Sequence, residues 1–158
     1  KRRAGIAQAM LNNPKILILD EPTAGLDPNE RIRFRNLISE LSEERMVLLS
    51  THIVSDVEYI ANEILLMKDG TIVNEGTLDE IINSMPEKVW NCLVPQDVAH
   101  ALSKKYKVSN MKMIQHKVEL RLISEEKPCE TAMYVEPVLE DVFLYYFGER
   151  GDNENGEI

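Results

Sequence analysis

The stretch K-I-L-I-L-D-E-P-T-A-G-L-D-P, from Lys15 to Pro28, says the most about how this chain folds. Residues 16–19 form an apolar run of four with no polar face. A run this short, rich in β-branched residues and ended by Asp-Glu-Pro, predicts a strand buried on both faces, as in a parallel sheet. Asp20 and Glu21 then follow the strand at its C-terminal end, where open α/β sheets bind their ligands.

The acidic pair has two interpretations. A carboxylate at Asp20 suits a hard cation such as Mg²⁺, which takes oxygen ligands and keeps several waters. A second carboxylate at Glu21 can accept a proton from an attacking water. The alternative is that the pair only begins a turn before Pro22, because turns favour Asp and Pro. The pair alone does not decide between the two.

Three segments of the sequence resemble the ATP-binding cassette (ABC) ATPases. The residues D-E-P-T-A-G-L-D-P, beginning at Asp20, resemble the Walker B and D-loop segment of that family. The residues L-L-S-T-H, which end at His52, thirty-one positions after Glu21, resemble its switch-histidine strand. The residues K-R-R-A-G-I-A-Q-A-M, at positions 1–10, resemble the helix that follows the family's L-S-G-G signature. The resemblance extends over residues 1–82, with the family's order and spacing.

The resemblance implies a role for each residue of the candidate site. It implies that Asp20 holds Mg²⁺, directly or through water, and that Glu21 activates the water that attacks ATP. It implies that His52 contacts the γ-phosphate, a task that suits a side chain able to donate and accept hydrogen bonds. Without this context, a lone histidine after a strand is more often structural. For Asp27, the resemblance implies a contact across the ATP-bound dimer.

Asp27 also has a complete structural explanation. It is placed to cap a helix whose first position is Pro28, and Glu30 completes the spacing of a capping box. The apolar residues of the predicted helix recur at the spacing of a core-facing stripe; they are Phe34, Leu37, Ile38 and Leu41. The next predicted strand is Met46–Ser50. We expect Asp27 to have both the capping role and the dimer role.

Two motifs of the ABC family are missing from the sequence. It contains no G-x-x-x-x-G-K-[ST], which would cradle the phosphates, and no L-S-G-G, which would close over the partner's nucleotide. The first three residues, Lys-Arg-Arg, also make a poor helix start, because they bring positive charge to the positive end of the helix dipole. We therefore expect the chain to begin inside a longer element and to hold the second half of a cassette.

The sequence predicts three parts: the cassette half at 1–85, an accessory domain at 86–147, and a disordered tail at 148–158. Met85-Pro86 marks the predicted boundary. In the accessory domain, strands with helices on one face predict a small α+β fold. The strands are expected at 88–94, 109–114 and 117–123, and the helices at 96–106 and 137–147. The segment E-P-V-L-E-D-V-F-L-Y-Y-F-G-E resembles the C-terminal extension of bacterial export-type cassettes.

Composition excludes some classes of function. The chain has 18 basic and 27 acidic residues, and its net charge of −9 disfavours nucleic-acid binding and adsorption to anionic lipid. Its apolar runs are too short to span a membrane, and no signal peptide is visible. Cys92 and Cys129 lack metal-ligand spacing, so we expect them to be reduced and to act as buried filler. His100 and His116 are expected at the surface.

The overall prediction is an α/β fold: a partial P-loop NTPase parallel sheet of the ABC type with a small α+β C-terminal domain. The predicted function is that of a transporter ATPase subunit of the bacterial export type, with ATP and Mg²⁺ as cofactors. The predicted partners are a membrane permease and a second ATPase subunit in a head-to-tail dimer, at the cytoplasmic face of the plasma membrane. Two alternatives are a non-enzymatic fragment or interaction module, and an ABC ATPase without a transporter that acts on nucleic acid or the ribosome.

Overall fold

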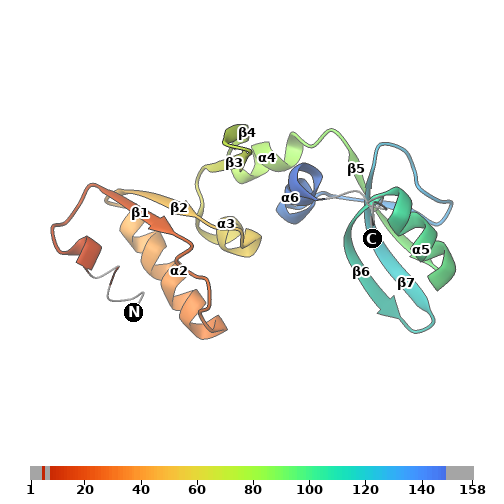
Figure 1. Ribbon diagram of the computed structural model, residues 1–158, viewed down its shortest axis with the longest axis horizontal. Helices are drawn as coiled ribbons and strands as arrows, with labels where there is room; N and C mark the ends of the chain where they lie inside the picture. The colour runs from red at the N-terminus through yellow and green to blue at the C-terminus, as the bar shows by residue number, and fades with distance from the viewer. Residues whose placement is uncertain (1–4, 6–7, 149–158) are drawn as a thin grey trace, which may run out of the picture. The chain divides into compact units, whose positions relative to one another are not determined.

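The computed structural model describes residue 5 and residues 8–148, and the chain divides into two compact units, Lys1–Asn62 and Glu63–Ile158 (Figure 1). Of the predicted N-terminal helix, Gly5 and residues 8–10 are helical, and the remainder lies outside the described residues. The predicted disordered tail also lies outside them, apart from Gly148.

The first unit contains a pair of parallel strands. Its described elements are β1 (Ile16–Asp20), α2 (Pro28–Ser42), β2 (Met46–Ser50) and α3 (Val54–Ile60). The strands β1 and β2 are in register, with Ile16 opposite Met46 and Asp20 opposite Ser50. Their C-terminal ends therefore lie at the same edge of the sheet, which confirms the parallel pairing predicted from the sequence.

One face of this strand pair is covered by α2. Leu17 and Leu19 of β1 are buried in one cluster with Phe34, Ile38 and Leu41, three residues of the predicted helix stripe. The alternate residues face the other way and are exposed; they are Ile16, Ile18, Met46 and Leu48. The prediction of a strand buried on both faces is therefore wrong for β1, because no described element of the unit covers its second face.

We expect the isolated chain to self-associate through this exposed face. Ile18 is 70% exposed, and apolar sheet faces of this kind promote association. Within the described residues β2 pairs with β1 alone, which also leaves an open strand edge. Light scattering after size exclusion should detect oligomers, and the variant Ile18→Lys with Leu48→Lys should shift them toward monomer. The matched variant Glu58→Lys, at an exposed position of α3, should not. A monodisperse wild-type monomer would contradict this expectation.

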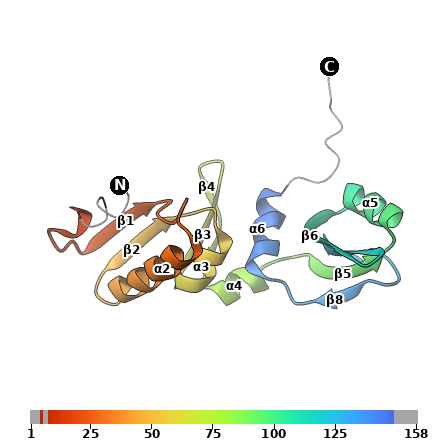
Figure 2. The ribbon, with the colours of Figure 1, turned by 90° about the horizontal axis from the view of Figure 1, so that it is seen from below.

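The second unit begins with a β-hairpin and continues into a four-stranded sheet. Its first elements are β3 (Ile64–Lys68), β4 (Thr71–Gly76) and α4 (Leu78–Asn83). The sheet has the order β6-β7-β5-β8, and all its neighbours are antiparallel. Its strands β5, β6 and β8 are labelled in Figure 2. Its strands are β5 (Lys88–Val94), β6 (Lys107–Ile114), β7 (Lys117–Ser124) and β8 (Met133–Val135), and its helices are α5 (Gln96–Lys105) and α6 (Leu139–Phe147).

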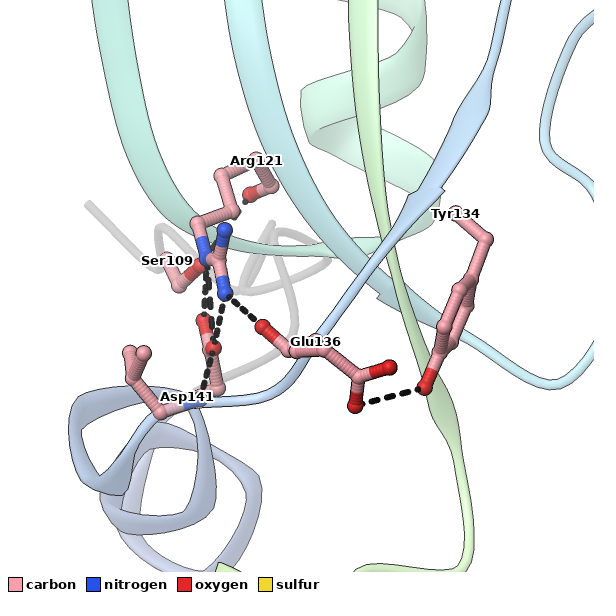
Figure 3. A network of polar contacts seen from close by, with 6 residues as sticks. Ser109, Arg121, Tyr134, Glu136 and Asp141 are labelled. Atoms are coloured by element: carbon pink, nitrogen blue, oxygen red, sulfur yellow. Dashed lines mark hydrogen bonds and ion pairs between the residues drawn. The ribbon is translucent and has the colours of Figure 1, made fainter.

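Helices lie on both faces of this sheet, not on one face as predicted. Ala99 and Leu102 of α5 belong to one core cluster with Leu120 of β7. Arg121, the next residue of β7, points to the opposite face because side chains alternate along a strand. There it pairs with Asp141 at the start of α6 (Figure 3). Leu139 and Val142 of α6 are buried, whereas the later apolar residues of the helix are half-buried.

Arg121 and Asp141 form an ion pair, and each of the two side chains also forms a hydrogen bond with the backbone. Asp141 is completely buried and accepts hydrogen bonds from Arg121 Nε at 3.0 Å and from Arg121 Nη2 at 2.7 Å. It also accepts from the Val138 backbone N–H at 2.9 Å, which satisfies an otherwise unpaired donor at the helix start. Arg121 Nη2 donates in addition to the Glu136 carbonyl at 2.8 Å (Figure 3). The pair thus joins β7, the segment after β8 and α6.

The end of α6 contacts the first hairpin of the unit. Lys68 of β3 donates to the Tyr146 carbonyl at 2.7 Å, and Asn74 of β4 donates to the Tyr146 hydroxyl at 3.3 Å. Asn74 of β4 donates to the hydroxyl of Ser84 at 2.6 Å. These contacts join the hairpin to the rest of the second unit, which begins at Glu63. From the sequence, the cassette is instead expected to end at Met85-Pro86. That cassette boundary stays a prediction.

Candidate active site

Two acidic residues follow β1 at the edge where both parallel strands end. Asp20 is the last residue of β1, and Glu21 begins the turn that leads to α2. The register places Asp20 opposite Ser50, the last residue of β2. His52 follows Ser50 by two residues. The sheet thus brings Asp20, Glu21 and His52 to one edge.

Ser50 connects the two acidic residues, although no role for it was predicted from the sequence. Its hydroxyl donates a hydrogen bond to Asp20 Oδ1. The backbone N–H of Glu21 donates to the Ser50 carbonyl at 3.0 Å and lies 3.3 Å from the Ser50 hydroxyl. One side chain therefore orients the Asp20 carboxylate and helps fix the backbone of Glu21. The one signal in the sequence for Ser50 was its position at the end of the strand that precedes His52.

Glu21 has an unusual backbone conformation. Its φ is +43°, in the left-handed region that costs a residue with a Cβ roughly 1–2 kcal/mol. Pro22 follows it and is buried, and a residue before proline is also disfavoured in the right-handed helical region. Thr23 is 1% exposed. The turn after β1 is therefore held by buried neighbours in a conformation of the kind that is found at functional sites.

His52 and Glu21 are in direct contact. The distance from His52 Nδ1 to Glu21 Oε1 is 2.8 Å, with the His52 side chain 71% exposed and that of Glu21 35% exposed. An ionised carboxylate can only accept, so the proton of this hydrogen bond belongs to Nδ1. A neutral His52 then presents Nε2 as an acceptor, and only a charged ring donates at both nitrogens.

Asp27 is placed as the helix cap that the sequence predicted. Its carboxylate accepts a hydrogen bond from the Glu30 backbone N–H at 2.9 Å, and Pro28 is the first residue of α2. This geometry confirms the structural role. The dimer contact of Asp27 stays a prediction. His100 and His116 are exposed, as predicted.

The oxygen atoms at this edge fit Mg²⁺ in one particular way. Asp20 supplies an exposed carboxylate and Ser50 a neighbouring hydroxyl, both hard oxygen donors. Over the described part of the chain, no group of three or more His, Cys, Asp and Glu residues can hold a metal. The Asp20 carboxylate suits an ion bound through one protein carboxylate, with water and phosphate completing its coordination.

Across the residues with described placement, no helix is long and apolar enough to cross a membrane. No family model matches the chain.

Comparison with known proteins finds ABC transporter ATP-binding proteins. The uncharacterised ABC transporter ATP-binding protein YxlF of Bacillus subtilis is 38% identical over 109 residues, covering 69% of this chain and 37% of the relative. The uncharacterised ABC transporter ATP-binding protein YcbN of the same organism is 33% identical over 145 residues, covering 90% of this chain and 47% of the relative. A solved "Structure of ATP binding subunit of ABC transporter" is 32% identical over 44% of this chain and 30% of that chain, with a TM-score of 0.41.

A TM-score this low does not establish a shared fold, so the sequence relatives carry the comparison. The Energy-coupling factor transporter ATP-binding protein EcfA2 of Clostridioides difficile is also similar, with 41% identity over 56% of this chain and 32% of the relative. The chain spans less than half the length of each of the three sequence relatives described. Over much of its length, the homologues of this chain are ABC transporter ATP-binding proteins.

Proposed function

We propose that this chain is the C-terminal part of an ABC transporter ATPase subunit and that its β1–β2 edge is the hydrolytic half of the ATP site. The observation that carries the proposal is the 2.8 Å contact between Glu21 and His52. The two side chains come from the ends of two parallel strands, beside the Asp20 carboxylate. A base, its hydrogen-bonded neighbour and a cation ligand at one sheet edge suit phosphoryl transfer to water.

Each residue of the edge has a distinct task in this mechanism. Asp20 binds Mg²⁺ directly or through water, with its carboxylate oriented by the Ser50 hydroxyl. Glu21 accepts the proton of the attacking water. His52 steadies Glu21 through Nδ1 and contacts the γ-phosphate through the rest of its ring. Bound Mg-ATP supplies the phosphoryl group and the cation that neutralises the charge developing on it.

A donating contact from His52 to phosphate places a further demand on the ring. With Nδ1 bonded to Glu21, Nε2 carries a proton only when the ring is charged. A ring turned over about its χ2 axis would instead release Glu21.

The direction of transport and the partners rest on the resemblance of the C-terminal segment. That segment favours export, a membrane permease as the partner, and a second ATPase subunit in a head-to-tail dimer. The permease would hold the chain at the cytoplasmic face of the plasma membrane. A net charge of −9 argues against the alternative of an ABC ATPase that acts on nucleic acid.

Substitution of Asp20 tests the proposed cation site. In a complete cassette, where this sequence is joined to a phosphate-binding loop and an L-S-G-G segment, we expect Asp20→Asn to raise the Mg²⁺ concentration for half-maximal hydrolysis about tenfold or more. The amide keeps the shape and loses the charge that attracts the cation. Phosphate release measured against free Mg²⁺ gives the result.

Asp79→Asn is the matched control, because the variant loses the same charge at an exposed position of α4 in the second unit. It should leave the Mg²⁺ requirement unchanged. An equal shift in both variants would remove Asp20 from the cation site. An interaction module would show no hydrolysis in the wild-type cassette at all.

A further inference from the structure

The chain contains two cysteines, Cys92 and Cys129, and both belong to the second unit. Cys92 lies in the middle of β5 and is completely buried, opposite Leu120 of β7. Cys129 is half-buried and lies in the irregular segment between β7 and β8. Their separation in the sequence gives no hint of a contact.

The fold brings the two cysteines together. Strand β8 pairs with β5 so that Met133 lies opposite Asn91, which places Ala132 next to Cys92. The turn before β8 is closed by a hydrogen bond from the Ala132 N–H to the Cys129 carbonyl at 3.1 Å. Ala132 and Cys92 belong to one buried cluster, and Cys129 packs against that cluster. The turn therefore folds the Cys129 thiol over the centre of β5.

The two thiols have different reactivity. Burial raises the pKa of the Cys92 thiol to about 12, and hydrogen bonding and charge from the neighbouring Cys129 add to the rise. Cys92 is therefore a protonated and inaccessible thiol in the folded chain. Cys129 is partly open to solvent, and the hydroxyl of Thr131 lies 3.3 Å from its sulfur, in position to donate to a thiolate. A dissolved reagent can meet only Cys129.

We propose that Cys92 and Cys129 form an intramolecular disulfide by exchange with a small-molecule disulfide, and that this bond is reversed by small-molecule thiols. The Cys129 thiolate attacks one sulfur of the oxidant, forms a mixed disulfide and releases one small thiolate. The Cys92 thiol then attacks the Cys129 sulfur and expels the second small-molecule sulfur, which takes the Cys92 proton and leaves as a thiol. Two protein thiols are oxidised to one disulfide, and the oxidant is reduced to two thiols.

The bond would lie entirely within the second unit. It would fix the turn before β8 to the centre of the sheet. Cys129 lies in a segment without regular structure, so its backbone can adjust to the geometry that a disulfide requires. Closing the loop from Cys92 to Cys129 also restricts the unfolded chain. The oxidised chain should therefore unfold at a higher urea concentration than the reduced chain.

The proposal is tested by equilibrating the whole 158-residue chain with oxidised and reduced glutathione at neutral pH. Thiols are then trapped with acid and an alkylating reagent, and the chain is analysed by mass spectrometry before and after tryptic digestion. We expect both thiols to be lost, a mass lower by two hydrogens, and a cross-linked peptide pair holding Cys92 and Cys129. In concentrated urea, the same glutathione mixture should give a ratio of internal disulfide to free thiols that is lower by about tenfold or more. The reason is that the unfolded chain no longer holds the two thiols together.

Variants separate the two steps. Cys129→Ala changes a half-buried position. In this variant, Cys92 should carry no glutathione while the chain is folded, and glutathione should modify it once urea has unfolded the chain. Cys92→Ala should stop at a glutathione adduct on Cys129, and Thr131→Val should slow that first step. A wild-type chain that accumulates the Cys129 adduct with Cys92 free would overturn the proposal. Disulfides between two chains in place of the internal bond would overturn it as well.

Discussion

A complete cassette carrying Glu21→Gln should hydrolyse ATP ~10²–10⁴-fold more slowly than the wild type while binding ATP as before. Gln keeps the size and polarity of Glu21, and its amide can still pair with Nδ1 of His52, 2.8 Å away in the wild type. The amide cannot take a proton from water, so the step lost is the activation of the nucleophile. Single-turnover hydrolysis and equilibrium nucleotide binding, measured on the same preparation, separate the two effects.

Two further variants make the result specific to Glu21. Glu58→Gln removes one carboxylate from an exposed position of α3 and should leave hydrolysis unchanged. His52→Ala should slow hydrolysis without unfolding the protein, because its side chain is largely exposed. If Glu21→Gln keeps turnover within a few-fold of the wild type, Glu21 is not the general base.

Asp141→Ala should destabilise the second unit by about 3–5 kcal/mol, the typical result of removing one partner of a buried ion pair. The variant leaves the Arg121 guanidinium beside an empty site on the sheet and removes the acceptor for the Val138 N–H. Trp90 is the single tryptophan of the chain and lies in β5. Its fluorescence during urea unfolding therefore follows the second unit in the intact chain.

Glu140→Ala is the matched control for Asp141→Ala. Glu140 is the adjacent residue in the same first turn of α6, carries the same charge and is exposed. Its loss should change the unfolding free energy by no more than about 0.5 kcal/mol. Replacing the pair together, as Arg121→Met with Asp141→Leu, should recover part of the loss because no uncompensated charge stays buried. Equal losses for Asp141→Ala and Glu140→Ala would mean that the ion pair does not hold the unit together.

Local sequence pattern predicted the elements that carry their own signals. The apolar run of β1, the cap at Asp27 and the alternation of β7 each depend on neighbouring residues, and the structure contains all three. The helix α4 was missed although its signal was present, because Thr77 and Glu80 form a capping box. The three-residue strand β8 was missed because its pairing with β5 alone defines it.

Contacts between distant residues could not be predicted from the same patterns. Alternation shows that Leu120 and Arg121 point to opposite faces of β7, but not that a helix covers each face. The site residues at 20, 21 and 52 were found through the resemblance to a family. Ser50 was missed because its role lies in two hydrogen bonds to a neighbouring strand. The contact of Cys92 with Cys129 was missed for the same reason, since only the pairing of β8 creates it.

The contact of α6 with the first hairpin has a consequence for synthesis of the chain. Lys68 and Tyr146 are 78 residues apart and join the beginning and the end of the second unit. Contacts of such long range form late, because the intervening chain must first be ordered. On the ribosome, β3 and β4 must therefore wait for nearly the whole unit to emerge before α6 can dock. A chain released before residue 139 would leave that hairpin, and the Arg121 side of the sheet, exposed to chaperones and proteases.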